Sequence, residues 1–124
     1  MLCPKCNETM QTVTYADIDV ERCDGCKGLW FDMLERQHLV AIEGSEAIDI
    51  GSAKTGERFN QIDDIKCPHC RCSMLKMVDA QQRHIWYEAC PSCYGVYFDA
   101  GEFRDYKENT VMDFFRDLFS KERP

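Results

Sequence analysis

The chain has 124 residues, a formal net charge of −7 and 44% hydrophobic residues, and nine of its residues are cysteines. A chain of this length usually forms one domain, although bound metal lets smaller units fold on their own. It has no apolar run near the roughly 18 residues of a membrane-spanning helix, and its first residues lack the basic flank and apolar stretch of an export signal. We therefore expect a cytoplasmic protein whose cysteines bind metal rather than form disulfides.

Eight of the cysteines form four CxxC pairs, and the arrangement repeats along the chain. The pairs are Cys3/Cys6, Cys23/Cys26, Cys67/Cys70 and Cys90/Cys93, and Cys72 is left over. CPKC matches CPHC at a shift of 64 residues, and CDGCKGLWFDMLE matches CPSCYGVYFDAGE at a shift of 67 residues. The chain is therefore an internal duplication.

Between the first two pairs, apolar and polar residues alternate over residues 13–20 around Ala16-Asp17, which predicts a two-stranded hairpin. The second copy repeats this alternation at residues 75–77 and 85–87, on either side of a polar turn. A hairpin with one CxxC before it and one after it brings four sulfurs together. Each copy is therefore expected to build one tetrahedral thiolate site.

Zinc suits four thiolates, at roughly 2.3 Å from each sulfur, and a structural zinc supplies on the order of 10–16 kcal/mol toward folding. Iron stays open as an alternative, because a single-iron electron carrier uses the same spacing. A thiol-redox role is a further alternative, although a thioredoxin-like motif needs only one CxxC in a βαβ context.

After the second CxxC, each copy has a glycine, an aromatic residue, an aspartate and a glutamate at the same offsets. These are Gly28, Trp30, Asp32 and Glu35 in the first copy and Gly95, Tyr97, Asp99 and Glu102 in the second. We expect the glycine to let the chain turn past the metal and the aromatic ring to cover the sulfurs. The two acids have the spacing of a capping box, which explains them without catalysis.

The first capped helix is predicted over about residues 32–43, ending near Gly44. Residues 44–66 carry too many apolar side chains for a flexible linker, so part of this semi-ordered connector is expected to pack on a ribbon or pair as a strand. Near the C-terminus, apolar residues at helical spacing predict an amphipathic helix that closes the chain's own core or docks on a partner. They are Val111, Phe114, Phe115, Leu118 and Phe119.

Three positions around the first CxxC of each copy carry further predictions. Asn7 and Arg71 stand where the turn favours glycine, so Arg71 is expected to be the more strained of the two. Cys72 aligns with Glu8 and is interpreted as a spare thiol, with an alternative ligand or an oxidation sensor as the other reading. The side chain of His69 is expected to point to solvent.

Residues 3–35, with the pattern CPxC, hairpin, CxxCxGxWFDxxE, resemble the transcription-factor-IIB-type zinc ribbon family, and residues 67–103 resemble a second copy. The resemblance implies a zinc-ribbon fold and two zinc ions, and it implies no known activity. The implied ligands are Cys3, Cys6, Cys23 and Cys26 for one ion and Cys67, Cys70, Cys90 and Cys93 for the other.

We therefore predict a small, metal-stabilised α+β protein of two tandem zinc ribbons. The predicted units are a ribbon with a short helix at 1–43, the connector at 44–66, a second ribbon with a helix at 67–108, and the amphipathic helix at 109–124.

The predicted function is that of a non-enzymatic adaptor, because four cysteines leave zinc no open coordination position. Its partner is expected to be another protein, or a second copy bound through the C-terminal helix, with a link to the transcription or translation machinery suggested by the family name. Nucleic acid is the alternative partner. The acidic charge disfavours it: eight thiolates and two zinc ions change the charge of −7 to about −11. We expect no membrane partner.

Overall fold

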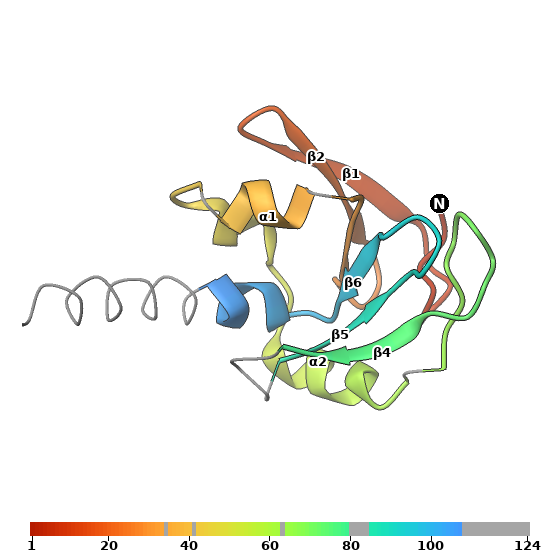
Figure 1. The fold of residues 1–124 in the computed structure, drawn as a ribbon. Coiled ribbons are helices and arrows are strands. Elements are labelled where there is room, and N and C mark those ends of the chain that lie inside the picture. The colour runs from red at the N-terminus through yellow and green to blue at the C-terminus, as the bar shows by residue number, and fades with distance from the viewer. Residues whose placement is uncertain (34, 41, 63, 80–84, 108–124) are drawn as a thin grey trace, which may run out of the picture.

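The computed structural model describes residues 1–33, 35–40, 42–62, 64–79 and 85–107, and the two copies within it share one antiparallel sheet (Figure 1). The described strands are β1 (Met10–Tyr15), β2 (Ile18–Cys23), β3 (Leu29–Phe31), β4 (Leu75–Val78), β5 (Trp86–Ala89) and β6 (Val96–Phe98). Their order across the sheet is β1-β2-β3-β6-β5-β4. Each copy thus supplies one half of the sheet, and β1 and β4 form the outer edges of its described part.

The first predicted hairpin is confirmed. Tyr15 pairs with Ile18 across the turn, and the two turn residues Ala16 and Asp17 both have positive φ, at 51° and 65°. A two-residue turn with positive φ at both positions has the twist that antiparallel strands need. In the second copy, β4 and β5 pair from Leu75↔Ala89 to Val78↔Trp86.

The two halves of the sheet meet where β3 pairs with β6. Trp30 pairs with Tyr97, its equivalent in the repeat, and Leu29↔Phe98 and Phe31↔Val96 flank that pair. Because equivalent residues face each other and their neighbours exchange places, the two copies are related by a pseudo-twofold axis through the Trp30–Tyr97 pair. The two tandem ribbons predicted from the sequence therefore form one continuous sheet.

Side chains alternate between the two faces of β3 and β6, and each face has its own core. On one face, Leu29, Phe31, Val96 and Phe98 pack against the helices that follow the ribbons. These helices are α1 (Glu35–Val40), the 3-10 helix η1 (Ser45–Ile48) and a helical turn at residues 102–107. On the other face, Trp30 and Tyr97 pack among the cysteines, with α2 (Ala53–Asn60) contributing the partly buried Phe59.

The first helix is shorter than predicted, since α1 begins at Glu35 rather than near residue 32 and ends before the left-handed Gly44, at φ 83°. Half of the predicted capping box forms there, because the Glu35 carboxylate accepts a hydrogen bond from the Asp32 amide at 3.0 Å. The Asp32 carboxylate instead accepts from the Trp30 indole at 3.1 Å. In the second copy the prediction is wrong for Asp99, whose carboxylate pairs with a lysine.

A residue of the connector supplies the missing cap. Asp49 is buried, and its carboxylate accepts hydrogen bonds from the amides of Gly101 and Arg104 at 2.9 and 3.0 Å. Arg104 in turn donates to the carbonyls of Asp49 and Gly51. A carboxylate at the first turn of a helix satisfies free amides and complements the helix dipole. Residues 44–66 thus tie the end of the first copy to the helix of the second.

The apolar residues of the connector divide between the interior and the surface. Ile48 and Ile65 are buried, whereas Ile50 and Ile62 are exposed, and Lys66 forms an isolated bridge with Ser73. The predicted amphipathic helix at 109–124 lies outside the described residues. Among the described helices, none is long and apolar enough to cross a bilayer.

The close approach of the two copies makes a prediction about Gly28. A Cβ placed there would lie 1.9 Å from the Tyr97 hydroxyl oxygen, so Gly28→Ala must push the two halves apart. We expect a loss of about 1–3 kcal/mol in the free energy of unfolding, as for other overpacked cores, measured by denaturant unfolding of the zinc-loaded protein.

Gly25→Ala is the matched control. Its Cβ would meet the flexible side chain of the exposed Glu8, and the equivalent position in the second copy is Ser92, which already carries a Cβ. Equal stability of the two variants would contradict the close contact between Gly28 and Tyr97.

Candidate metal centres

The first group of four cysteines joins the knuckle before β1 to the knuckle after β2. The sulfurs of Cys3, Cys6, Cys23 and Cys26 all lie within 4.8 Å of one another, with Cys3–Cys26 at 3.7 Å and Cys6–Cys23 at 3.2 Å. Four sulfurs around a tetrahedral zinc are about 3.8 Å apart when each bond is about 2.3 Å. Three of these cysteines are buried and Cys6 is half-buried, so this site is closed to solvent on most sides.

The second group is built in the same way but is more open. The sulfurs of Cys67, Cys70, Cys90 and Cys93 also lie within 4.8 Å of one another, and Cys67–Cys93 measures 3.8 Å. Cys70 is exposed and Cys93 half-buried. The two sites therefore have the same donor set and differ in their access to solvent.

Backbone amides turn toward the sulfurs in both sites, as expected for knuckles that hold thiolates. Gly25 donates to Cys23 at 3.3 Å, Cys70 donates to Cys67 at 3.3 Å, and Ser92 and Cys93 donate to Cys90 at 3.4 Å. The residue after every CxxC has positive φ: Lys27 and Tyr94 adopt it after the second CxxC of each copy, at 64° and 63°, and Asn7 and Arg71 adopt it after the first, at 69° and 62°. Arg71 is the more strained of the two, because arginine tolerates this region less well than asparagine.

In each group of four, one thiol has a lowered pKa. The hydrogen bond between the Cys3 and Cys26 sulfurs lowers the pKa of Cys3 to about 4, with help from the Tyr97 hydroxyl and against the effect of burial. Burial raises the pKa of Cys90, but hydrogen bonds from the amides of Cys93 and Ser92, together with those of the Cys72 and Cys93 thiols, lower that pKa to about 6. Desolvation raises the pKa of Cys23 to about 11 and that of Cys70 to about 12. The thiolate form that zinc binds is therefore favoured at Cys3 and Cys90 and opposed at Cys23 and Cys70 before the metal is bound.

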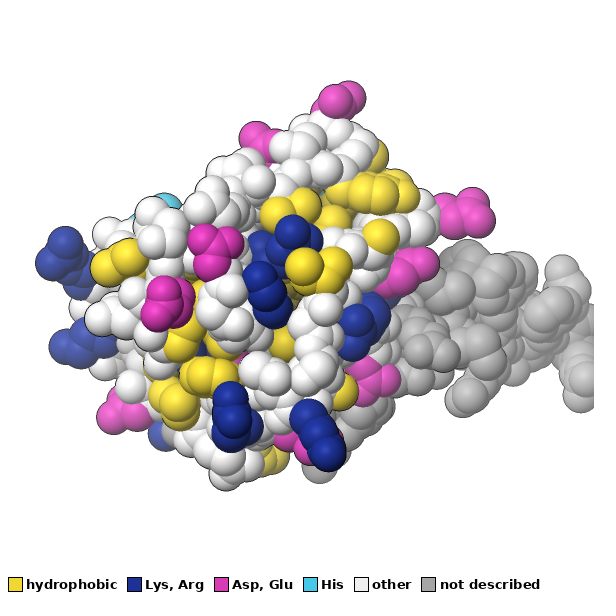
Figure 2. All heavy atoms as spheres, turned by 180° about the vertical axis from the view of Figure 1, so that it is seen from behind, with side chains coloured by type: hydrophobic (Ala, Val, Ile, Leu, Met, Phe, Trp, Pro, Cys, Tyr) yellow, Lys and Arg dark blue, Asp and Glu magenta, His cyan; other side chains and the backbone are white. Residues whose placement is uncertain are grey.

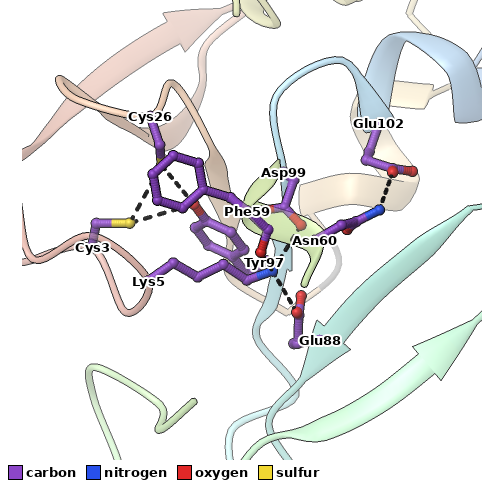
Figure 3. Close-up of polar contacts among 9 residues, drawn as sticks. All are labelled: Cys3, Lys5, Cys26, Phe59, Asn60, Glu88, Tyr97, Asp99 and Glu102. Carbon is purple, nitrogen blue, oxygen red and sulfur yellow. Dashed lines mark hydrogen bonds and ion pairs between the residues drawn. The ribbon is translucent and has the colours of Figure 1, made fainter. Parts of the chain in front are cut away.

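Each copy covers the metal site of the other. The Tyr97 hydroxyl, from the second copy, lies 3.4 Å from the Cys3 sulfur and 3.1 Å from the Cys26 sulfur of the first site (Figure 3). Trp30, from the first copy, packs in the sulfur-rich core and contacts the ring of His69 between the ligands Cys67 and Cys70. The prediction that these rings cover sulfurs thus holds across the pseudo-twofold axis.

The role expected of the two glycines is wrong. Neither Gly28 nor Gly95 is among the residues with positive φ. A Cβ at Gly28 would collide with Tyr97, and one at Gly95 would lie 2.3 Å from the Trp30 ring. These glycines therefore make room for the aromatic ring of the other copy rather than turning the chain past the metal.

A buried ion cluster lies beside the first site and also joins the two copies. The side chain of Lys5 is fully buried within the CPKC knuckle, and its ammonium contacts Glu88 at 2.6 Å and Asp99 at 2.7 Å (Figure 3). It also donates to the Phe59 carbonyl at 3.1 Å. Removing one member of such a pair would leave a buried charge uncompensated, so Lys5 fixes the second copy to the first knuckle.

Two carboxyl groups in this region are harder to ionise than usual. Burial raises the pKa of Asp99 to about 6, although the nearby Lys5 ammonium opposes the shift. Burial also raises the pKa of Glu102 to about 7, although the Asn60 amide that donates to it at 2.9 Å acts the other way. The physical cause in both is desolvation of the charged form.

The pseudo-twofold partner of this cluster is weaker. His69 occupies the position of Lys5 in the second CPxC, and its Nε2 lies 3.7 Å from the Asp32 carboxylate, with both side chains at least half exposed. His69 thus reaches solvent as predicted, while its ring also contacts Trp30. Among the described residues, the equivalent of the buried Lys5 ion pairs in the second site is thus an exposed pair.

A family model described as transcription factor zinc-finger matches residues 2–42 and 66–109. The chain belongs to this family. The two matched ranges contain the two copies and all eight cysteines of the two groups, so the zinc-finger family and the sulfur geometry lead to the same assignment. No match was found among curated proteins or among solved structures.

The zinc-finger protein can hold one structural zinc in each group of four thiolates. The structure brings the eight predicted ligands together in the predicted sets, and Cys72 lies outside both. Sequence reasoning missed Lys5, Glu88, Asp49 and Asn60. Their contacts join segments 42 to 94 residues apart, and no local pattern marks them.

We expect about two zinc ions per chain, and we expect the whole fold to depend on them. Cys93→Ser should retain at most one zinc and lower the midpoint of thermal unfolding, since a structural zinc contributes on the order of 10–16 kcal/mol. Cys72→Ser is the control and should retain both ions. Elemental analysis and circular dichroism measure the two effects; a chelator-stripped protein that melts like the loaded one would contradict the assignment.

Tyr97→Phe should loosen the first zinc selectively, because it removes the hydroxyl that lies against Cys3 and Cys26. Loss of such a supporting hydrogen bond lowers metal affinity by about 10–100-fold. Competition with a coloured chelator measures this change. Tyr94→Phe, at a tyrosine that is 64% exposed, is the control, and equal affinities in the two variants would show that the hydroxyl contributes nothing.

Proposed function

We propose that this zinc-finger protein is a non-enzymatic adaptor that binds an extended segment of another protein along β4. The observation that carries the proposal is the exposure of apolar side chains on an outer strand. Leu75 and Val78 are each 51% exposed, Met77 is 36% exposed, and Trp86 on the neighbouring strand is 46% exposed. All four residues of β4 are exposed.

A strand of this kind has the features of a peptide-binding edge. β4 pairs with β5 on one side and is the last strand of the described sheet on the other. An extended peptide can add to such an edge through its backbone, while apolar surface nearby receives alternate side chains. A groove of about 180 Å³ beside β4 and β5, with Asn60 of α2 on its wall, offers a place for one such side chain.

The opposite edge of the sheet differs. β1 has the same place in the first copy, but its outward residues are polar: Thr12 and Thr14 are exposed and donate to Glu21 and Asp19. The duplication thus leaves one apolar and one polar edge. This asymmetry favours β4 as the surface for a partner.

The charge of the protein indicates the chemistry of that partner. With a formal charge of −7 before metal is counted, the protein attracts segments that carry basic residues. We propose an apolar, alternating segment with basic flanks, from a protein of the transcription or translation machinery in keeping with the family description. The proposed absence of catalysis rests on zinc sites whose four sulfurs leave no position for a substrate.

Nucleic acid is the less favoured partner. Figure 2 shows Lys and Arg side chains interspersed with Asp, Glu and hydrophobic side chains on one face of the molecule. Nonspecific binding to phosphates requires clustered positive charge, because its affinity comes mainly from counterion release. Binding to oligonucleotides that falls steeply with salt and is unaffected by changes in β4 would overturn the proposed protein partner.

The proposal is tested with two synthetic peptides that share an alternating Val-Thr centre and carry either lysine or glutamate flanks. We expect the lysine-flanked peptide to shift the amide resonances of residues 75–78 in the zinc-loaded protein. Val78→Lys should weaken this binding by about tenfold or more, equivalent to about 1.4 kcal/mol, since it places a charge in the apolar contact and repels the basic flanks.

Thr14→Lys is the matched control, because Thr14 is the exposed residue equivalent to Val78 on the other edge. It should leave the affinity unchanged. Shifts confined to other parts of the protein, equal effects of the two substitutions, or no binding of either peptide would each contradict docking on β4.

A further inference from the structure

Cys72 is the one cysteine of the nine that belongs to neither group of four. It is half-buried, and its sulfur lies 3.6 Å from that of the ligand Cys90 and 4.0 Å from the Ser92 hydroxyl. Its backbone carbonyl accepts from the amide of Cys67 at 2.9 Å, which fixes it beside the knuckle. The second site therefore has a fifth thiol in contact with one of its four ligands.

We propose that Cys72 and Cys90 are an oxidation-sensitive thiol pair, and that a disulfide between them opens the second zinc site. The oxidant is a hydroperoxide such as hydrogen peroxide. This inference does not depend on the adaptor function, because it concerns only the second site and its neighbouring thiol.

The chemistry proceeds in two balanced steps. The thiol of Cys72, which is the more exposed of the two, attacks one oxygen of the peroxide; the O–O bond breaks, and the products are a Cys72 sulfenic acid and water. The Cys90 thiolate then attacks the Cys72 sulfur, and with one proton taken up a second water leaves as the S–S bond forms. The two sulfurs are oxidised by two electrons in total, and the peroxide is reduced to two molecules of water.

Zinc is left with three sulfur ligands after this reaction. The remaining thiolates are Cys67, Cys70 and Cys93, of which Cys70 is exposed and Cys93 half-buried. Water can therefore take the fourth position, and a competing ligand can remove the ion. Because structural zinc sites are closed by four ligands, loss of one converts a stable site into a labile one.

The first site provides the contrast within the same molecule. Glu8 occupies the position of Cys72, and its side chain lies against Gly25 as that of Cys72 lies near Ser92, the equivalent of Gly25. The first site thus has no thiol outside its four ligands beside Cys23 that could take up the oxidant. Tyr97 and the buried Lys5 further close this site. Oxidation is therefore directed to the second site.

The test treats the full-length, zinc-loaded protein with hydrogen peroxide and follows the released zinc with a coloured chelator. We expect the wild-type protein to release one of its two zinc ions rapidly, and peptide mapping by mass spectrometry should find Cys72 joined to Cys90. Cys72→Ser and Cys72→Ala should both start with two zinc ions and release the ion several-fold more slowly. Dithiothreitol with added zinc should restore the wild-type metal content.

A further variant tests the proposal by adding a thiol to the first site rather than removing Cys72 from the second. Glu8→Cys places a thiol beside Cys23 and should make the zinc ion of the first site sensitive to peroxide as well. Peptide mapping should then find the introduced thiol joined to Cys23, in that variant alone. Equal rates of zinc release from wild-type and both Cys72 variants would overturn the proposal. A wild-type disulfide between two ligands, without Cys72, would overturn it as well.

Discussion

The structure depends on the pairing of β3 with β6, where Trp30 of one copy faces Tyr97 of the other. This contact places two large rings side by side in the middle of the sheet, and both are fully buried. Each ring also reaches the metal knuckle of the opposite copy. The two zinc sites, the central strands and the two glycines that admit the rings therefore form one cooperative unit, in which neither ribbon buries its aromatic residue without the other.

The same arrangement supports two sites of different character. In the first, three buried cysteines, the Tyr97 hydroxyl and the Lys5 ion pairs exclude water. In the second, Cys70 is exposed and Cys72 lies against a ligand. Duplication kept the eight ligands and allowed the residues around them to diverge. The first site is accordingly suited to holding the fold together, and the second is more open to solvent and lies on the same half of the sheet as the apolar edge β4.

Much of this organisation could be predicted from the sequence because it is local. Four CxxC pairs separated by alternating residues identify two thiolate sites, and Ala16-Asp17 places the first turn, since both depend on short stretches of chain. At the first helix, one of the two hydrogen bonds of the predicted capping box forms, from the Asp32 amide to the Glu35 carboxylate. The capping-box prediction was wrong at Asp99 because Lys5, far away in sequence, offers that carboxylate a buried ion pair, while Asp49 caps the helix in its place.

The sequence by itself determined the metal ligands, the family and the presence of two copies, because ligand spacing and turn conformation are set by neighbours along the chain. Only the tertiary structure decided how the copies meet, which ring covers which metal, and why Asp49 caps a helix that begins more than 50 residues later. Those contacts arise when two amphipathic halves bury their remaining apolar strand edges against each other. Such burial is a property of surfaces in three dimensions, and no spacing in the sequence records it.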